Sequence, residues 1–346
     1  MSSDRVRSPA LTSFVVASRY MPVYIATLLL VIVASIWAPA SLSGVALRAI
    51  APYGAVLGIA DLGQMSVIMT GGIDLSVPGT MSLAAAIMVG VGDGSNENIA
   101  IAIATAIAVA ALIGLVNGLL IGGLKLNALI TTLAVGLIVI GGVNRYASTF
   151  PVQSRVPPGL SDWISTRILG VSPVFWTGVG LTIVLIVGLR YIAVGRKFQA
   201  VGANPVASNV AGVQVNHHRI LVYMVAAVFY AIAGVALAGL LRNPGVGAGT
   251  TYLLAPIAAV VIGGASLTGG LASPLSTFVA ALFLTGLNQM LRTMGLPTSL
   301  QSVVFGLVII GGMLVSGDRI IRGVEQLLRE RRRPNDPQSQ PVPGPM

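Results

Sequence analysis

Residues 99–121 read IAIAIATAIAVAALIGLVNGLLI, an apolar stretch without a single charged side chain. A helix needs about 20 consecutive apolar residues to cross a hydrocarbon core of roughly 30 Å. The stretch therefore predicts a membrane-spanning helix. Comparable stretches on both sides of it bring the total to about ten spans, which predicts an all-α polytopic membrane protein. The other expected spans are residues 22–40, 49–70, 75–92, 126–147, 172–194, 218–241, 250–266, 272–294 and 297–316.

The composition also indicates a membrane protein. Apolar residues make up 55% of the chain and charged residues only 9%, against about 25% charged residues in a soluble domain. The 42 glycines suit helices in lipid, where association depends on close packing. The net charge of +10 does not indicate a nucleic-acid partner, because no basic patch is interleaved with base-stacking aromatic residues. Cysteine is absent, which excludes disulfides and Cys-based sites.

The distribution of Lys and Arg predicts the orientation. Basic residues concentrate before the first span, between the sixth and seventh spans, and after the tenth. With ten spans these three segments share one side, which the positive-inside rule assigns to the cytoplasm. We therefore expect a multi-pass protein of the cell inner (cytoplasmic) membrane with both termini in the cytoplasm. The basic residues are Arg5, Arg7, Arg19, Arg190, Arg196, Lys197, Arg219, Arg319, Arg322, Arg329, Arg331, Arg332 and Arg333.

The expected domain organisation has three parts. Residues 1–21 form a cytoplasmic N-terminal segment, residues 22–318 the transmembrane domain, and residues 319–346 a cytoplasmic tail that is partly disordered. A cleaved signal peptide ending near residues 38–40 (Ala-Pro-Ala) is an alternative for the N-terminus.

An internal repeat occurs at an offset of 170 residues. Residues 136–142 (GLIVIGG) recur as residues 306–312 (GLVIIGG), and Gly79-Thr80 recurs as Gly249-Thr250. The repeat maps spans 2–5 onto spans 7–10, and this odd shift reverses each helix, which predicts an inverted repeat typical of transporters. Coincidence within a restricted alphabet is the alternative. Within the eighth span, Pro256 and Gly263-Gly264 are candidate breaks.

Residues 70–77 read TGGIDLSV and fall between the second and third spans. The double glycine lets the backbone leave a helix, and Asp74 with Ser76 can cap the next helix. One interpretation is that the segment does no more than cap the next helix. The other is a discontinuous helix that faces a polar path, which occurs at membrane depth only where protein or water surrounds it.

These residues resemble a known family. The TGGIDLS of residues 70–76 is similar to a motif of the permeases of ribose-type ABC importers, which move monosaccharides and related small polyols. Asn117-Gly118, residues 195–205 (GRKFQAVGANP) and residues 263–270 (GGASLTGG) agree with it. The resemblance covers roughly residues 20–318 and implies a type II ABC importer-like permease fold. Departures are Pro78, where the family usually has glycine, and His217-His218 before Arg219.

The resemblance implies that residues 195–216 form a cytoplasmic coupling loop that docks on an ATPase. Its small residues, among them Ala200, Gly202, Ala203 and Ala207, would form a surface with little bulk; an ordinary helical connection is the alternative. The expected coupling residues are Gly195, Arg196, Ala200, Gly202, Asn204, Ala207 and Gly212.

The loop of residues 149–172 is expected on the external side. In the family this side meets the binding protein. An interfacial loop anchored by Trp163 and Trp176 is the alternative.

Polar residues in the spans or at their ends are candidates for a translocation path. An ionisable side chain within a span, such as Asp61, suggests function by default, and amide side chains suit sugar hydroxyls. Interhelical hydrogen bonds and helix caps are the alternatives. The candidates are Asp61, Asp74, Asn117, Asn127, Asn144 and Asn288.

The chain carries no catalytic or nucleotide-binding motif. Its two lysines, Lys125 and Lys197, lie outside any phosphate-binding loop pattern. Adjacent His217 and His218 do not share a helix face, so a metal site is not expected. We expect no enzymatic activity, no metal and no cofactor in this chain, with ATP and magnesium bound by a partner ATPase.

The resemblance implies the function of a permease subunit of an ATP-binding cassette importer for a monosaccharide or related small polyol. The expected partners are an ABC ATPase, a periplasmic or lipoprotein sugar-binding protein, a second permease copy in a homodimer or heterodimer, and membrane lipid. An ion-coupled secondary transporter, suggested by Asp61 and the inverted repeat, is the main alternative. A membrane-embedded enzyme is the third class.

Overall fold

The computed structural model describes residues 9–150 and 154–316. Within these ranges the fold is helical, with one isolated β-bridge between Ile168 and Val171. The helices are α1 (Pro9–Trp37), η1 (Pro39–Leu42), α2 (Gly44–Met69), α3 (Val77–Gly90), η2 (Asn96–Asn98), α4 (Ile99–Gly118), the π-helix η3 (Leu119–Gly123), α5 (Ala128–Ala147), α6 (Pro158–Ser165), α7 (Pro173–Tyr191), α8 (Ala193–Ala203), α9 (Pro205–Val210), α10 (Val215–Leu241), η4 (Thr250–Tyr252), α11 (Ala255–Ile262), α12 (Pro274–Thr293) and α13 (Thr298–Ser316).

The predicted all-α polytopic class is confirmed. Among the described residues, 7 helical segments are long and apolar enough to cross a membrane, and they include α2, α4, α5, α7, α10 and α12. Three shorter apolar segments, Val77–Gly90, Thr250–Ile262 and Thr298–Gly312, coincide with the third, eighth and tenth expected spans. The total of about ten crossings stays a prediction.

The eighth expected span is short because it ends at the double glycine. The amide of Gly263 donates to the carbonyl oxygen of Ala259 at 2.8 Å, and Gly264 has a φ of +86°, a left-handed backbone that favours glycine. Pro256 lies in the first turn of α11, where its missing N–H has no helical partner to lose. Gly263-Gly264 therefore ends α11, and Pro256 lies where α11 begins after η4, so the eighth expected span is interrupted at both candidate positions.

The packing of the helices shows the internal repeat. Helix α10 packs on α3 and α4, and its repeat counterpart α2 packs on α11 and α12. Likewise α3 contacts α5, and α11 contacts α13. The first half of the repeat contains α2 to α5, and the second half contains α10 to α13. Replacing each helix by its counterpart in the other half therefore converts one set of contacts into the other.

The central helices α2 and α10 run in opposite directions. Gly63 on α2 lies against Tyr230 on α10, whereas Gly72, just after α2, lies against Tyr223. Residue numbers thus rise along α2 as they fall along α10. The repeat is inverted, as the sequence predicts.

Glycines bring the helices of both halves close together. A Cβ on Gly58 of α2 would lie 2.5 Å from the ring of Phe278 on α12, and a Cβ on Gly114 of α4 would lie 2.5 Å from the carbonyl oxygen of Tyr223 on α10. Such contacts are how helices associate where lipid gives no hydrophobic drive.

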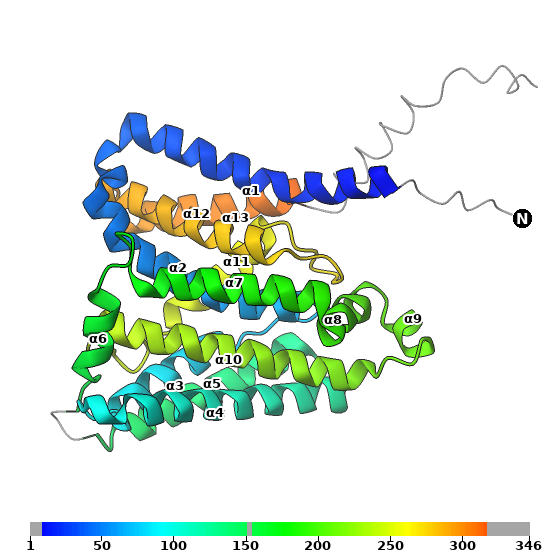
Figure 1. Cartoon of the computed structure of the whole chain (residues 1–346), viewed down its shortest axis with the longest axis horizontal. Coiled ribbons are helices and arrows are strands. Elements are labelled where there is room, and N and C mark those ends of the chain that lie inside the picture. The colour runs from blue at the N-terminus through cyan, green and yellow to red at the C-terminus, as the bar shows by residue number, and fades with distance from the viewer. Residues whose placement is uncertain (1–8, 151–153, 317–346) are drawn as a thin grey trace, which may run out of the picture.

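The two ends of the helix bundle carry different segments (Figure 1). The start of α1 lies at the same end as α8 and α9, and α6 lies at the opposite end. This agrees with placing the N-terminal segment and residues 195–216 on one side and residues 149–172 on the other. Assigning the first side to the cytoplasm stays a prediction. Residues 1–8, 151–153 and 317–346, with the expected tail, lie outside the described residues.

Candidate functional site

The segment of residues 70–76 interrupts the helices in the interior of the bundle. Helix α2 ends at Met69, and the amide of Gly71 donates to the carbonyl oxygen of Ile68 at 2.9 Å. Gly71 has a φ of +82°, so glycine is needed for this turn. The chain then runs without helical structure to α3, and Asp74 and Ser76 are 1% exposed. The double glycine therefore produces a break between α2 and α3 whose residues Asp74 and Ser76 are buried, whereas Gly71 is exposed. That this break faces a polar path stays a prediction.

Asp74 organises the start of the next helix. Its Oδ1 atom accepts hydrogen bonds from the backbone amide of Ser76 at 2.8 Å and from the Ser76 hydroxyl at 2.6 Å. The Ser76 Oγ atom in turn accepts a hydrogen bond from the Asn117 side chain on α4 at 2.9 Å. On the other side, the amide of Leu75 donates to Thr132 Oγ1 on α5 at 2.8 Å. Asp74 thus forms a turn immediately before α3, but no side chain of the described residues accepts from the free amides of the helix itself, so that part of the capping prediction is wrong. Helices α4 and α5 contribute further hydrogen bonds to the break.

Gln64 on α2 holds the backbone of Asp74 from the opposite side. With its amide oriented to satisfy its neighbours, Gln64 donates to the carbonyl oxygen of Asp74 at 3.0 Å and accepts from the Asp74 amide at 3.2 Å. The same side chain lies 3.0 Å from the hydroxyl of Tyr230 on α10. We call Gln64, Asp74, Ser76, Asn117, Thr132 and Tyr230 the Asp74 network.

The Asp74 network does not use all of its hydrogen-bonding capacity in this conformation. Asp74 Oδ2, Asn117 Oδ1 and the Tyr223 hydroxyl are buried and have no hydrogen-bond partner within the described chain. The Tyr223 hydroxyl abuts Gly72, where a Cβ would lie 2.5 Å from it. Most buried polar groups in proteins are paired. The region around the break therefore contains three buried polar groups that have no partner among the described residues.

Residues 195–216 form two short helices rather than one. Asn204 separates α8 from α9, and its Oδ1 atom accepts from the Ala207 amide at 2.9 Å, so Asn204 is the N-cap of α9. Ala200 and Ala207 are exposed, and Val206 and Val210 on α9 are 76% and 85% exposed. This end of the bundle thus presents a surface of small and apolar side chains, which we call the α9 surface (Figure 1).

Gly202 does not belong to the exposed surface, and that part of the prediction is wrong. It is buried, and a Cβ there would overlap the carbonyl oxygen of Met69. Gly195 is also buried, against the backbone of Gly188. Both glycines serve close packing inside the subunit, whereas Arg196 and Gly212 are exposed, like Ala207.

Three segments meet at Gly202. The amide of Gly270, in the loop after α11, donates to the carbonyl oxygen of Met69 at 2.8 Å. A Cβ on Gly269 would lie 2.8 Å from the carbonyl oxygen of Gly202 and 3.0 Å from the amide nitrogen of Gly71. We call Met69, Gly71, Gly202, Gly269 and Gly270 the glycine junction. It joins the end of α8 directly to the turn that opens the buried break.

The expected path residues do not come together as one site. Asp74 and Asn117 meet at Ser76, as described above. Asp61 is fully buried on α2, and neither of its carboxylate oxygens has a partner among the described residues. All three lie inside the subunit rather than on its surface.

The other three expected path residues occupy separate places. Asn127 is exposed and caps α5 through a bond from the amide of Ile130 at 3.3 Å. Asn144 is exposed and donates to the carbonyl oxygen of Ile140 at 3.1 Å, and Asn288 is half-buried on α12. Asn127 and Asn144 therefore bond within their own helix, which is closer to the helix-capping alternative than to a translocation path.

The sequence interpretation missed three members of the site. Thr132, Tyr223 and Tyr230 lie within apolar spans and were not considered. Tyr223 and Tyr230 are seven residues apart, which places them on one face of α10. Two hydroxyls on one face of an otherwise apolar span are a signal for a buried polar contact.

Comparisons with known proteins identify the family. Residues 46–313 match the family described as "Branched-chain amino acid transport system / permease component". The chain belongs to this permease family. No solved structure matches the chain.

Relatives in this permease family resemble the chain over most of its length. The ribose import permease protein RbsC of Escherichia coli K12 is 32% identical over 75% of this chain and 82% of its own. The autoinducer 2 import system permease protein LsrC of Klebsiella pneumoniae is 37% identical over 76% of each chain. The fructose import permease protein FrcC of Rhizobium meliloti is 31% identical over 78% of this chain and 76% of its own.

Proposed function

We propose that this chain is the permease subunit of an ATP-binding cassette importer for a monosaccharide or related small polyol. The observation that carries this proposal is the similarity to permeases that import ribose and fructose, which extends over at least three quarters of the chain. The family description names branched-chain amino acids, so an apolar amino acid is the competing substrate class. The comparisons do not favour the ion-coupled secondary transporter.

The energy source in this proposal is a separate ATPase subunit that binds ATP and magnesium. Neither Lys125 nor Lys197 lies in a phosphate-binding loop pattern. The α9 surface supports docking of the ATPase, because Val206 and Val210 expose apolar side chains at the end of the bundle. A substrate-binding protein delivers the solute at the opposite end, where α6 lies, and a second permease copy completes the path.

The glycine junction supplies the mechanical connection. The backbone of α8 contacts the last residue of α2 through Gly202, and the loop after α11 is hydrogen-bonded to the same residue, Met69. A displacement of α8 and α9 by the ATPase therefore reaches the turn at Gly71 without passing through flexible side chains. In the Asp74 network, Asp74 lies a few residues after this turn. In this proposal the hydrogen bonds of the network rearrange at Asp74 Oδ2 and Asn117 Oδ1, which have no partner among the described residues.

Reconstitution tests the function. The chain is co-expressed with a candidate ATPase and a candidate binding protein from the same organism and placed in liposomes with ATP on the α9 side. We expect uptake of labelled ribose or fructose that needs ATP and all three proteins. ATP-dependent uptake of labelled leucine, with no uptake of labelled ribose or fructose, would instead assign the amino-acid class. Uptake that follows a proton or sodium gradient without the ATPase would contradict the proposal.

A further inference from the structure

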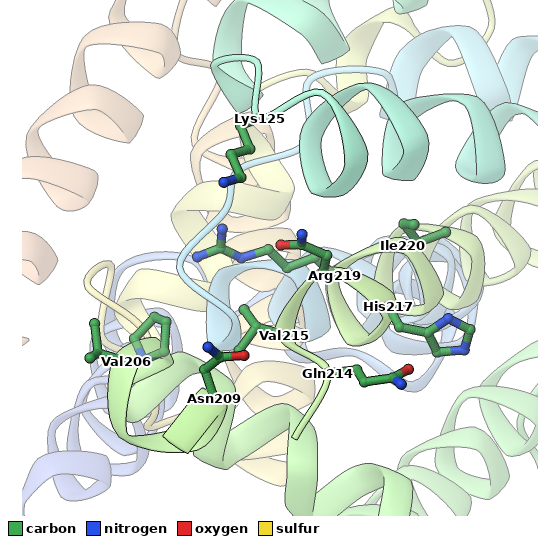
Figure 2. A pocket seen from close by; sticks show the side chains of 10 residues that line it. Lys125, Val206, Asn209, Gln214, Val215, His217, Arg219 and Ile220 are labelled. Carbon is green, nitrogen blue, oxygen red and sulfur yellow. The ribbon is translucent and has the colours of Figure 1, made fainter. Parts of the chain in front are cut away.

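A groove of about 800 Å³ opens between α9, the first turns of α10 and the turn that joins η3 to α5. Figure 2 shows the Lys125 side chain pointing from this turn toward the guanidinium of Arg219 on α10, with Asn209 of α9 on the far side. The volume lies within the roughly 300–1,000 Å³ of sites that hold small molecules. It is larger than one protein side chain needs.

The groove is cationic. Lys125, His217 and Arg219 line it, and no acidic residue does. No hydrogen bond or ion pair within the described chain engages the side chain of Lys125 or Arg219. Lys125 has a φ of +60°, which is uncommon for a residue other than glycine. Such a backbone persists where its surroundings fix it, and here it presents the ammonium group to the groove.

The groove lies where membrane spans end. Lys125 falls between the candidate spans Asn96–Gly123 and Ala128–Ala147, and Arg219 lies near the start of the span Val215–Leu241. Leu124 and Leu126 on either side of Lys125 are 68% and 48% exposed. Positive groups and exposed leucines therefore occur together at one edge of the bundle.

We propose that this groove binds the phosphate headgroup of an anionic phospholipid, with its acyl chains along the leucine-bearing turn. Basic pockets between spans at the cytoplasmic face suit such headgroups. The Arg219 guanidinium can bind two phosphate oxygens and Lys125 adds a point charge, while Asn209 supplies an amide for the glycerol oxygens. Val206 of the α9 surface also lines the groove, so the lipid headgroup would lie at the edge of the proposed ATPase interface, on the side of Lys125. An acidic segment of a partner protein would match the charge, but it would leave Leu124 and Leu126 unexplained. This inference is independent of the transported solute.

Native mass spectrometry of the full-length chain with equal amounts of phosphatidylglycerol and phosphatidylcholine tests the proposal. We expect the wild type to retain phosphatidylglycerol preferentially. Lys125→Gln and Arg219→Gln should each weaken that retention roughly fivefold, since each charge near a membrane surface contributes about that factor. Arg190→Gln is the matched control, because Arg190 is an exposed cation at the end of α7 and outside the groove.

Thermal unfolding of each variant in detergent shows that the protein is folded. Lys125→Gln changes an exposed turn residue, so it remains a test if Arg219→Gln fails to fold. Equal retention of the two lipids by the wild type, or an equal loss in Arg190→Gln, would overturn the proposal. Displacement of the lipid by inorganic phosphate at equal concentration would assign the groove to a free anion. Loss of ATPase co-purification with unchanged lipid retention would assign it to an acidic protein segment.

Discussion

The amide of Gly270 donates a hydrogen bond to the carbonyl oxygen of Met69 at 2.8 Å. Met69 is the last residue of α2, in the first half of the repeat, and Gly270 follows α11, in the second half. Gly202, from the segment between the halves, packs against the same oxygen. One carbonyl group thus fixes the relative position of the three parts of the chain on which the proposed coupling depends.

Gly202→Ala should reduce both stability and coupling. The added methyl group would overlap the Met69 carbonyl oxygen, and overpacking of this kind costs about 1–3 kcal/mol. We expect a lower thermal unfolding midpoint and reduced ATP-driven uptake. Gly180→Ala on α7 is the control, because a Cβ there has no atom within 4 Å. Equal behaviour of the two variants would show that the junction does not limit coupling.

Ala207→Arg should abolish docking of the ATPase without unfolding the permease. Ala207 is exposed on α9, so a long charged side chain meets no neighbour within the subunit but blocks a partner. Co-purification of the ATPase measures docking, and the unfolding midpoint measures the fold. Ala207→Ser, which adds little bulk, should retain the ATPase. Normal ATPase recovery with Ala207→Arg would remove the α9 surface from the proposed interface.

Asp74→Ala should destabilise the buried break. The change removes the acceptor of both hydrogen bonds from Ser76, and leaving buried donors unpaired costs about 1–3 kcal/mol. Asp74→Asn retains an oxygen for Ser76 and places its nitrogen where Oδ2 has no partner, so it should lose much less. Thermal unfolding and uptake are measured together. If Asp74→Ala matches the wild type in unfolding midpoint and in uptake, the hydrogen bonds from Ser76 to Asp74 are dispensable.

The orientation can be tested by cysteine labelling, because the chain has no cysteine of its own. Thr166, just after α6, and Ala211, just after α9, are both exposed. In intact cells an impermeant thiol reagent should modify Thr166→Cys but not Ala211→Cys, and lysis should expose the latter. Labelling of both in intact cells would place the two segments on the same side and exclude the predicted topology.

Helix positions were predictable because apolar length decides them. The sixth expected span, residues 172–194, corresponds to α7 at Pro173–Tyr191, where Ser172 supplies the N-cap. The inverted repeat was predictable because two separated matches share one offset of 170 residues. Close packing explains only some of the matched glycines: a Cβ on Gly79 or Gly249 would lie against neighbouring backbone, whereas Gly141, Gly142, Gly306 and Gly311 have no atom of the described residues within 4 Å of a Cβ. The eighth helix was predicted too long, because Gly263-Gly264 ends α11 at Ile262, before the hydrophobicity falls.

The function of individual small residues was not predictable. A small residue looks the same in the sequence whether it is exposed, as Ala207 is, or packs against the backbone, as Gly202 does. Thr132 and Tyr230 were missed because their contacts come from distant segments. Spacing along the chain describes one helix at a time and carries no information on which helices meet.

The glycine junction consists of main-chain atoms and residues without side chains. It therefore has no group that could recognise what is being carried. A family whose members handle different cargoes can keep such a relay unchanged while the delivering protein diversifies. If the proposed coupling holds, movement of the glycine junction does not depend on which solute is transported.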